Sequence, residues 1–483
     1  MPADLSIVVL GASGDLARRK IYPALFALYC QKLLPPVFNI FGFARTSFDA
    51  NEFRTHIAEH LTCRYTPDHA CSDDIREFLD RCHYVTGSYA SRESFIDLYE
   101  AMRRIETSPD IARVFYMAIP SAAFFDTAAA IGGAGLSGCG DKTGWPRVVL
   151  EKPFGSDRES SDLLVRELAQ VFPEDRTYRI DHYLGKEVIQ NLMVLRFANT
   201  VFEPLWSRQF VERVDIVWKE QIGMGSRGNY FDSYGIIRDV VQNHLIQILS
   251  LVAMERPVDT LAASVRDAKV KVLRSILPLT LDNLVVGQYG AGLVNGTRHH
   301  AFREEALVRR DSITPTYAAC VLRVDNERWR GVPFVVTAGK GSDAALSEVR
   351  LKFRPPQSNI FCKSGVCLPA NEFVMRIQPD EALFLKIVNK EPGLEVKPVE
   401  TELNLKYKST FQSQIPDAYE CLLLDVIRGD RSLFISRDEL AAAWDIFTPV
   451  LHETERLKIV PEFYEFGSSG PAGAERLTGV SSR

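Results

Sequence analysis

The segment RIDHYLGKE, residues 179–187, gathers four side chains that could do chemistry. Asp181 offers a carboxylate, His182 an imidazole, Tyr183 a phenol and Lys186 an ammonium group. Three of these groups can donate hydrogen bonds to an anion, and a carboxylate can hold an imidazole in one tautomer. A solvated surface turn could have the same composition, so the interpretation depends on the rest of the chain.

A second polar cluster lies in IIRDVVQNHLIQIL, residues 236–249. The segment predicts an apolar helix, and at ~100° per residue its polar side chains fall within an arc of about 140°. These side chains are Asp239, Asn243, His244 and Gln247. A polar arc on an apolar helix must find partners or line a cavity. Since an imidazole titrates near neutral pH, His244 is a candidate general base, and a hydrogen-bonded core histidine is the alternative.

A glycine turn near the start of the chain could hold the phosphates of a dinucleotide. The run SIVVL at 6–10 predicts a buried parallel strand, and GASGDLA follows it at 11–17, before a helix. Glycines permit a tight turn and a close approach of backbone N–H groups, and a helix N-terminus favours an anion. The candidate cofactor-binding residues are Gly11, Ser13, Gly14, Asp15 and Leu16. A glycine turn without a dinucleotide is the alternative.

The end of the second predicted strand bears on the choice of cofactor. This strand, NIFGF at 39–43, is followed by Ala44 and Arg45. NAD sites commonly place an acid there to meet the ribose 2′-hydroxyl, whereas a guanidinium can pair with a 2′-phosphate. Asp49 comes too late in the chain to be that acid. The sequence therefore favours NADP over NAD, and a plain surface arginine is the alternative.

The patterns of strands and helices divide the chain into two parts. Up to residue 178 strands alternate with helices, which predicts an α/β domain with a doubly wound parallel sheet. From residue 179 helices precede consecutive strand-like runs, which is typical of an α+β domain with an antiparallel sheet. We therefore expect domains over 1–178 and 179–470, and a disordered tail rich in Gly, Ser and Ala over 471–483.

Composition limits the classes of protein. A hydrophobic content of 46% with 25% charged residues is ordinary for a soluble enzyme. The net charge of −5 gives no reason to expect nucleic acid or a membrane as partner, and no apolar run reaches transmembrane length. The start MPADLSIVVLGASG is too short and too interrupted by glycine for a signal peptide.

The cysteines indicate a reducing compartment. The chain has nine, scattered without a C-x-x-C pair, so we expect free thiols and a cytoplasmic location. Cys362 and Cys367 form the close pair of the second half and could be metal ligands, but no partner pair lies nearby, so we expect no metal.

Six motifs occur together in one order. They are GASGDLA, EKPFG at 151–155, RIDHYLGKE, IIRDVVQNHL at 236–245, NERW at 326–329 and PDAYE at 416–420. The set closely resembles the glucose-6-phosphate dehydrogenase family over nearly the whole chain. The resemblance implies a Rossmann domain followed by an α+β domain with a large, mainly antiparallel sheet, in homodimers or homotetramers. It also implies that D-glucose 6-phosphate is oxidised at C1 to 6-phosphoglucono-δ-lactone by NADP, the first step of the oxidative pentose phosphate pathway.

The resemblance assigns the chemistry to two residues. It makes His244 the general base and Asp181 the carboxylate that fixes the tautomer of that base. A carboxylate on one ring nitrogen also stabilises the imidazolium that forms.

The resemblance assigns the substrate phosphate to RIDHYLGKE. A phosphate monoester is nearly dianionic and needs charge-assisted donors, which His182, Tyr183 and Lys186 can supply. A helical turn would place His182 and Lys186 on one face, and Gly185 would let the phosphate or backbone approach. Further substrate contacts fall on Lys152, which also reaches the cofactor, Glu220, Asp239, Lys340 and Gln378.

Some members of the family carry a second, structural NADP in the later domain. Here Thr337, Ala345 and Leu346 stand where those members have basic residues, and Asn404 replaces an acid. The resemblance therefore gives little support for that second NADP, although the basic residues Arg350, Arg376 and Lys386 remain. Two other functions stay open: a related two-domain oxidoreductase of unphosphorylated sugar, and a non-catalytic NADPH-binding sensor.

Overall fold

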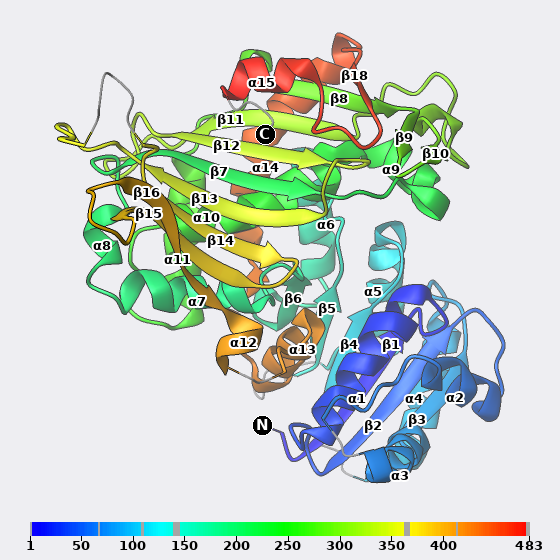
Figure 1. Ribbon diagram of the computed structural model, residues 1–483. Coiled ribbons are helices and arrows are strands. Elements are labelled where there is room, and N and C mark those ends of the chain that lie inside the picture. Colours follow the sequence, from blue (N-terminus) through cyan, green and yellow to red (C-terminus); the bar gives the residue numbers. More distant parts are fainter. Residues whose placement is uncertain are drawn as a thin grey trace. The chain divides into compact units, whose positions relative to one another are not determined.

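The computed structural model of the chain describes residues 2–65, 68–107, 111–138, 145–361, 368–411 and 414–479. These residues form two units (Figure 1). Unit 1 comprises residues 1–185, 260–266 and 416–441, and unit 2 comprises 186–259, 267–415 and 442–483. The sequence interpretation divided the chain once, after residue 178, whereas in the structure two later segments return to unit 1.

Unit 1 contains a seven-stranded sheet in the order β17-β6-β5-β4-β1-β2-β3. All its pairs are parallel except that of β17 with β6. The strands are β1 (Asp4–Leu10), β2 (Val37–Ala44), β3 (Cys82–Thr86), β4 (Ala112–Met117), β5 (Arg147–Leu150), β6 (Thr177–Ile180) and β17 (Phe434–Ile435). The helices are η1 (Ala17–Ile21), α1 (Tyr22–Cys30), α2 (Ala50–Ala58), α3 (Asp68–Asp80), α4 (Arg92–Ile105), α5 (Phe124–Gly133), α6 (Arg158–Ala169) and α13 (Ala418–Arg428).

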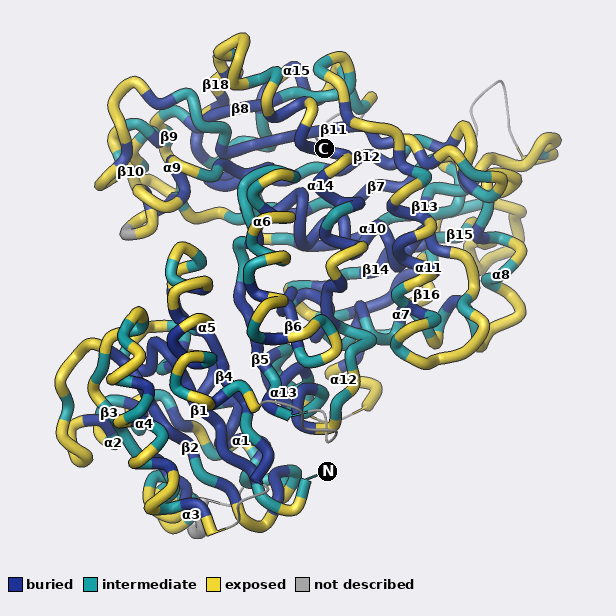
Figure 2. Tube along the Cα trace, turned by 180° about the vertical axis from the view of Figure 1, so that it is seen from behind, coloured by how far each residue is buried: buried dark blue, intermediate teal, exposed yellow. Residues whose placement is uncertain are grey.

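Both faces of this sheet are covered (Figure 2). Along β1 the side chains of Leu5, Ile7 and Val9 enter a core with α1 and α13, while Val8 and Leu10 are buried on the opposite face. Alternate residues of a strand point to opposite faces, so a strand that is apolar throughout needs helices on both sides. The prediction of a doubly wound α/β domain is confirmed.

Unit 2 contains a nine-stranded sheet in the order β16-β15-β14-β13-β7-β12-β11-β8-β18. Only the pairs β7–β12 and β8–β18 are parallel among its described strands, so the predicted mainly antiparallel sheet is confirmed. The strands are β7 (Val211–Lys219), β8 (Leu284–Gly290), β11 (Tyr317–Arg323), β12 (Pro333–Gly339), β13 (Leu346–Phe353), β14 (Glu372–Gln378), β15 (Ala382–Lys390), β16 (Pro398–Lys406) and β18 (Glu462–Glu465), beside the hairpin β9 (Gly292–Val294) and β10 (Thr297–His299).

The helices of unit 2 include two that contain residues of both units, α11 and α14. The helices are α7 (Glu187–Phe197), α8 (Phe202–Leu205), α9 (Gly228–Ile236), η5 (Ile237–Leu245), α10 (Ile246–Ala253), α11 (Ala262–Arg274), α12 (Tyr407–Phe411), α14 (Arg437–Arg456) and α15 (Ala472–Thr478). Helix α15 lies where the sequence predicts a disordered tail. Its small residues Gly473 and Ala474 are buried, and the helix packs against β8, β11 and β18.

Two helices differ from the sequence expectation because part of each is a π-helix. Residues Ala17–Ile21 form π-helix η1, directly after the glycine turn, and Pro23 then lies in the first turn of α1. α1 continues η1 without a break, and the N–H of Tyr22 donates to the Ala17 carbonyl five residues back. The helix has therefore left the i→i−4 pattern where Pro23, which has no N–H to donate, follows. Residues Ile237–Leu245 form π-helix η5, where the sequence predicts one regular helix. π-helical turns are rare and occur frequently at functional sites.

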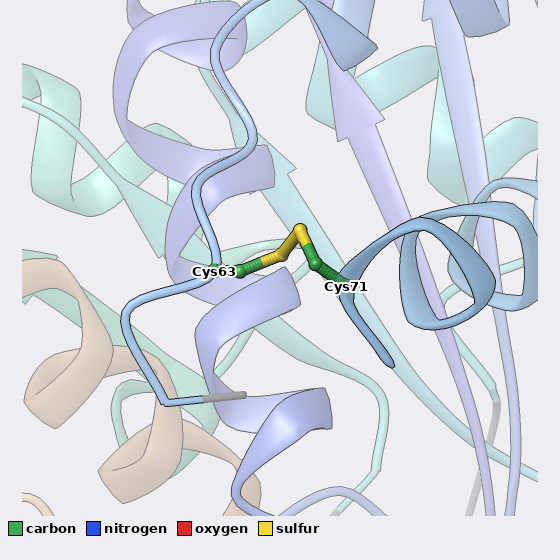
Figure 3. The surroundings of a disulfide bond; sticks show 2 residues. All are labelled: Cys63 and Cys71. Atoms are coloured by element: carbon green, nitrogen blue, oxygen red, sulfur yellow. A yellow bond between two sulfur atoms is a disulfide. The ribbon is translucent and has the colours of Figure 1, made fainter. Parts of the chain in front are cut away.

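A disulfide joins Cys63 to Cys71 in unit 1 (Figure 3). Their Cα atoms are 5.7 Å apart, a separation that a disulfide spans. The expectation that all cysteines are free thiols is therefore wrong for this pair. Cys82 and Cys320 are buried thiols, and burial raises the pKa of both. Cys362 and Cys367 lie outside the described residues.

Three buried side chains close the C-terminal end of α10, which continues the helix that carries His244. The Arg196 guanidinium donates to the carbonyl oxygens of Leu251 and Met254, at 2.6 and 2.8 Å. The indole N–H of Trp206 donates to the carbonyl of Val252, and that of Trp329 to the carbonyl of Ala253, each at 2.8 Å. The last carbonyls of a helix have no partner within it, and a cation at this end is favourable. This arrangement explains the tryptophan of the NERW motif.

Replacing Trp329 with Phe should lower the free energy of unfolding by ~1–3 kcal/mol, because the ring remains but a buried carbonyl loses its donor. Urea denaturation followed by circular dichroism measures the change. Trp145→Phe is the matched control, because the Trp145 ring packs on Arg147 and its N–H makes no hydrogen bond among the described residues. Equal losses in the two variants would contradict the role of the indole donor.

Candidate active site

The carboxyl ends of the strands of unit 1 carry several candidate residues. Gly11 follows β1, Arg45 follows β2, Lys152 lies just after β5 and Asp181 follows β6. These strands are parallel members of one sheet, so all four residues lie at the same edge. Ligands of open α/β sheets bind outside this edge.

The glycine turn after β1 has a backbone conformation that depends on Gly11. Gly11 has φ +85°, its N–H donates to the Phe43 carbonyl at 2.9 Å, and an added Cβ would lie 2.2 Å from the Ala118 carbonyl oxygen. Only glycine fits this position. Ser13 joins the turn to the end of β2 through a 3.0 Å hydrogen bond with the hydroxyl of Thr46. Gly14 and Asp15 are exposed at the start of the helix, and Leu16 is half-buried.

The end of β2 carries an exposed arginine and a nearby acid that caps the next helix. The Arg45 side chain is exposed, with its guanidinium carbon 5.6 Å from the centre of the Tyr89 ring. Asp49 caps helix α2 and accepts hydrogen bonds from the N–H groups of Asn51 and Glu52, at 2.8 and 2.9 Å. Asp49 therefore stabilises the start of α2, while Arg45 presents a guanidinium at the surface beside the end of β2.

The segment after β6 is a tight turn. Asp181 is 2% exposed, and its Oδ1 accepts from the N–H of Tyr183 at 2.9 Å. The turn continues with hydrogen bonds from the N–H of Leu184 to the Asp181 carbonyl and from Gly185 to His182. Lys186 then has extended φ and ψ values as the residue that precedes α7. The expectation that His182 and Lys186 share one face of a helical turn is therefore wrong, because the helix begins only at Glu187.

Gly185 permits a close approach of backbone, as the sequence predicts. A Cβ at this position would lie 2.6 Å from the carbonyl oxygen of Ala418, in the PDAYE segment. Any side chain here would displace the segment or the turn. The late segment thus packs directly on RIDHYLGKE within unit 1.

In unit 2 the sheet brings three candidate residues to one edge, and a fourth, Lys186, contacts one of them. Strands β7, β12 and β14 run in the same direction, since β13 is antiparallel to β7 and to β14. Their carboxyl ends carry Glu220, Lys340 and Gln378. The Lys340 ammonium contacts a carboxylate oxygen of Glu220 at 2.7 Å, and the Lys186 ammonium contacts the amide oxygen of Gln378 at 2.7 Å. Two pairs of predicted substrate residues are thus in direct contact.

Lys340 is the most enclosed cation of this group. It is 4% exposed, and its ammonium lies 5.0 Å from the Trp218 ring centre and 5.5 Å from that of Phe231. Aromatic faces attract a desolvated ammonium, and they hold its position.

His244 lies on π-helix η5, which packs against β12. The His244 side chain is 3% exposed, and its backbone N–H donates to the Asn243 side chain at 2.6 Å. The Asn243 amide in turn donates to the carbonyl of Arg238 at 3.0 Å. Asp239 is half-buried on the same helix, and Gln247 is buried in the following turn. The angles calculated for a regular α-helix do not apply to η5, although the polar residues do lie on one continuous helical stretch.

Sequence reasoning missed a buried carboxylate beside the candidate residues of unit 1. Glu151 is 8% exposed, and burial raises the pKa of its carboxyl group. The hydroxyl of Tyr116 donates to it at 2.6 Å, and that of Tyr419 is hydrogen-bonded to it as well. Glu151 and Tyr419 lie in EKPFG and PDAYE, but no spacing rule relates residues 268 positions apart. The sequence did offer one signal: Glu151 directly follows a buried apolar strand, and a buried carboxylate needs hydrogen-bond donors.

The fold and these residues define a two-domain oxidoreductase that uses a dinucleotide. Two family models match the chain: "Glucose-6-phosphate dehydrogenase, NAD binding domain" over residues 8–191 and "Glucose-6-phosphate dehydrogenase, C-terminal domain" over residues 193–483. The chain belongs to the glucose-6-phosphate dehydrogenase family, which confirms the resemblance found in the sequence.

Individual relatives are similar over nearly the whole chain. The chloroplastic glucose-6-phosphate 1-dehydrogenase of Nicotiana tabacum is 48% identical over 98% of this chain and 80% of its own length. The cytoplasmic glucose-6-phosphate 1-dehydrogenase 5 of Arabidopsis thaliana is 44% identical over 98% of this chain and 90% of its own length. A solved structure, a glucose-6-phosphate dehydrogenase in complex with its substrate glucose-6-phosphate, has a TM-score of 0.91 at 38% identity, with both chains fully covered.

Across the described part of the chain, no helix has both the length and the apolar character needed to cross a membrane.

Proposed function

We propose that the chain oxidises D-glucose 6-phosphate at C1 and yields 6-phosphoglucono-δ-lactone and NADPH. The C1 hydroxyl loses a proton while hydride leaves C1 for the nicotinamide of NADP⁺. The single observation that carries the proposal is the unit 2 sheet edge, where Lys186 and Gln378 are in contact and the helix of His244 packs nearby. It agrees with the substrate named for the structural neighbour.

His244 is the general base in this proposal. An imidazole has a pKa close to neutral pH and can accept the hydroxyl proton without a large energetic cost. Its burial keeps competing water away from the reacting proton. Asp181 is assigned to the other ring nitrogen, where a carboxylate stabilises the imidazolium formed by proton transfer.

The remaining residues bind and orient the substrate and the cofactor. His182, Tyr183 and Lys186 hold the phosphate through an imidazole, a phenol and an ammonium group. Contacts to the sugar are assigned to Lys152, Glu220, Asp239, Lys340 and Gln378. Bound NADP⁺ supplies the hydride acceptor. Its pyrophosphate is assigned to Gly11, Ser13, Gly14, Asp15 and Leu16, its 2′-phosphate to Arg45, and its nicotinamide side to Lys152.

The proposal extends to location and assembly. The family relatives include proteins named chloroplastic and proteins named cytoplasmic. We propose a cytoplasmic location, which the buried free thiols of Cys82 and Cys320 support and the Cys63–Cys71 disulfide does not. We also propose a homodimer or homotetramer. Light scattering during size-exclusion chromatography measures the mass, and a monomer at enzyme concentrations used in assays would exclude this assembly.

Replacing His244 with Asn should lower kcat by about a thousandfold and leave the KM for glucose 6-phosphate nearly unchanged, because only the base is lost. Steady-state NADPH formation measures both constants. His299→Asn is the control. His299 lies in β10, where its ring stacks on that of Phe466, and it has no assigned role. A His244→Asn enzyme within tenfold of the wild-type rate would refute the base assignment.

Replacing Lys186 with Ala should raise the KM for glucose 6-phosphate about 50-fold, since a charge-assisted hydrogen bond to the phosphate is lost. The KM for NADP⁺ should not change. Lys271→Ala removes an exposed lysine of α11 and serves as the control. An unchanged KM for the sugar phosphate in Lys186→Ala would count against the phosphate site.

Replacing Arg45 with Leu should raise the KM for NADP⁺ about 30-fold and leave the KM for NAD⁺ nearly constant, because only NADP⁺ carries the 2′-phosphate. The ratio of kcat/KM for the two cofactors is the measurement. Arg104→Leu is the control. The Arg104 side chain is exposed, and its guanidinium lies 3.6 Å from a carboxylate oxygen of Glu100, also exposed. A parallel loss with both cofactors would show that Arg45 does not select NADP⁺.

A further inference from the structure

Glu151 forms the centre of a buried hydrogen-bond network in unit 1. Its carboxylate receives hydrogen bonds from the hydroxyl groups of Tyr116 and Tyr419. All three residues are buried, and burial raises the pKa of both phenols, so the tyrosines stay protonated and act as donors. A hydrogen bond from a neutral phenol to a buried carboxylate is strong and fixes the orientation of the ring.

The ring of Tyr419 also lies beside an assigned phosphate ligand. Its centre is 6.2 Å from that of the His182 ring, and the two planes differ by only 11°. The ring of Tyr183 also lies beside His182. The two ring centres are 5.1 Å apart, and the ring planes are inclined at 54°. His182 is half-buried on a turn, where packing against rings restricts the rotamers of the imidazole.

The backbone around Tyr419 is anchored on both sides. Asp417 accepts from the ammonium of Lys20 at 3.0 Å, and Glu420 accepts from the hydroxyl of Tyr65 at 2.9 Å and pairs with Arg64. The position of the Tyr419 ring is therefore set by the backbone of the segment as well as by Glu151.

We propose that Tyr419 is a positioning residue for the phosphate site: with its hydroxyl held by Glu151, its ring keeps the imidazole of His182 in the orientation that receives the substrate phosphate. The proposal rests on the assignment of His182 to the phosphate. A preoriented donor binds more tightly because ordering the side chain no longer opposes binding. Tyr116 donates to the same Glu151 carboxylate. Among the ring contacts of the described residues, Tyr419 stacks on His182 and Tyr116 does not.

The first experiment compares variants on the two sides of Glu151. Tyr419→Leu removes the ring and should raise the KM for glucose 6-phosphate about tenfold, with kcat and the KM for NADP⁺ within about twofold of wild type. Tyr419→Phe keeps the ring, fills the same volume and should raise the KM about threefold. Tyr116→Phe is the matched control, since it removes an equivalent hydroxyl from Glu151, and its KM should stay within about twofold of wild type. Equal effects of the two Phe variants would overturn the proposal, because the loss would then reflect Glu151 alone.

The second experiment tests whether Tyr419 acts through His182. In a His182→Asn background, adding Tyr419→Leu should change the KM for glucose 6-phosphate by less than about twofold, because the imidazole to be positioned is absent. Additive effects of the two substitutions would overturn the proposal and indicate a general structural role. If His182→Asn alone leaves this KM unchanged, the phosphate assignment itself is wrong and the proposal falls with it.

Discussion

The need to satisfy charged groups that are removed from water governs the arrangement of this chain. Glu151 and Asp181 in unit 1, and Lys340 in unit 2, are almost fully buried at the carboxyl ends of strands. An isolated charge in such a place is costly, so the fold must provide each of these side chains with hydrogen-bonding partners. Tyr116 and Tyr419 donate hydrogen bonds to Glu151, and the backbone N–H of Tyr183 donates to Asp181.

This requirement accounts for the path of the chain. A segment more than two hundred residues after the first sheet returns to unit 1, adds β17 to the edge of the sheet and packs α13 on α1. At the start of α13, the backbone of Ala418 lies against Gly185, and Tyr419 reaches Glu151. The PDAYE motif is therefore structural support for the residues after β6. In unit 2 distant side chains likewise support a helix end. The last carbonyls of α10 accept hydrogen bonds from Arg196, Trp206 and Trp329.

Local pattern predicted much of the fold. The apolar run before Gly11 indicated a parallel strand, and consecutive strands after residue 284 indicated the antiparallel sheet; both predictions depend on neighbouring residues alone. The return of residues 416–441 could not be predicted, because it depends on contacts between distant segments. The π-helix at Ile237–Leu245 and the extended Lys186 were missed because tertiary packing overrides the regular helical period. The candidate residues followed from chemistry and motif resemblance, whereas the Tyr116–Glu151–Tyr419 network requires the structure.

The central claim is that the chain recognises two phosphorylated ligands and transfers hydride between them. The most direct test mixes the protein with glucose 6-phosphate or glucose, and with NADP⁺ or NAD⁺, and follows NADPH or NADH absorbance. We expect rapid reduction with NADP⁺ and the phosphorylated sugar, and rates at least about a hundredfold lower with glucose, since the charge-assisted phosphate contacts are lost. Equal rates with glucose would contradict the phosphate site, and cofactor binding without reduction would identify a sensor instead of an enzyme.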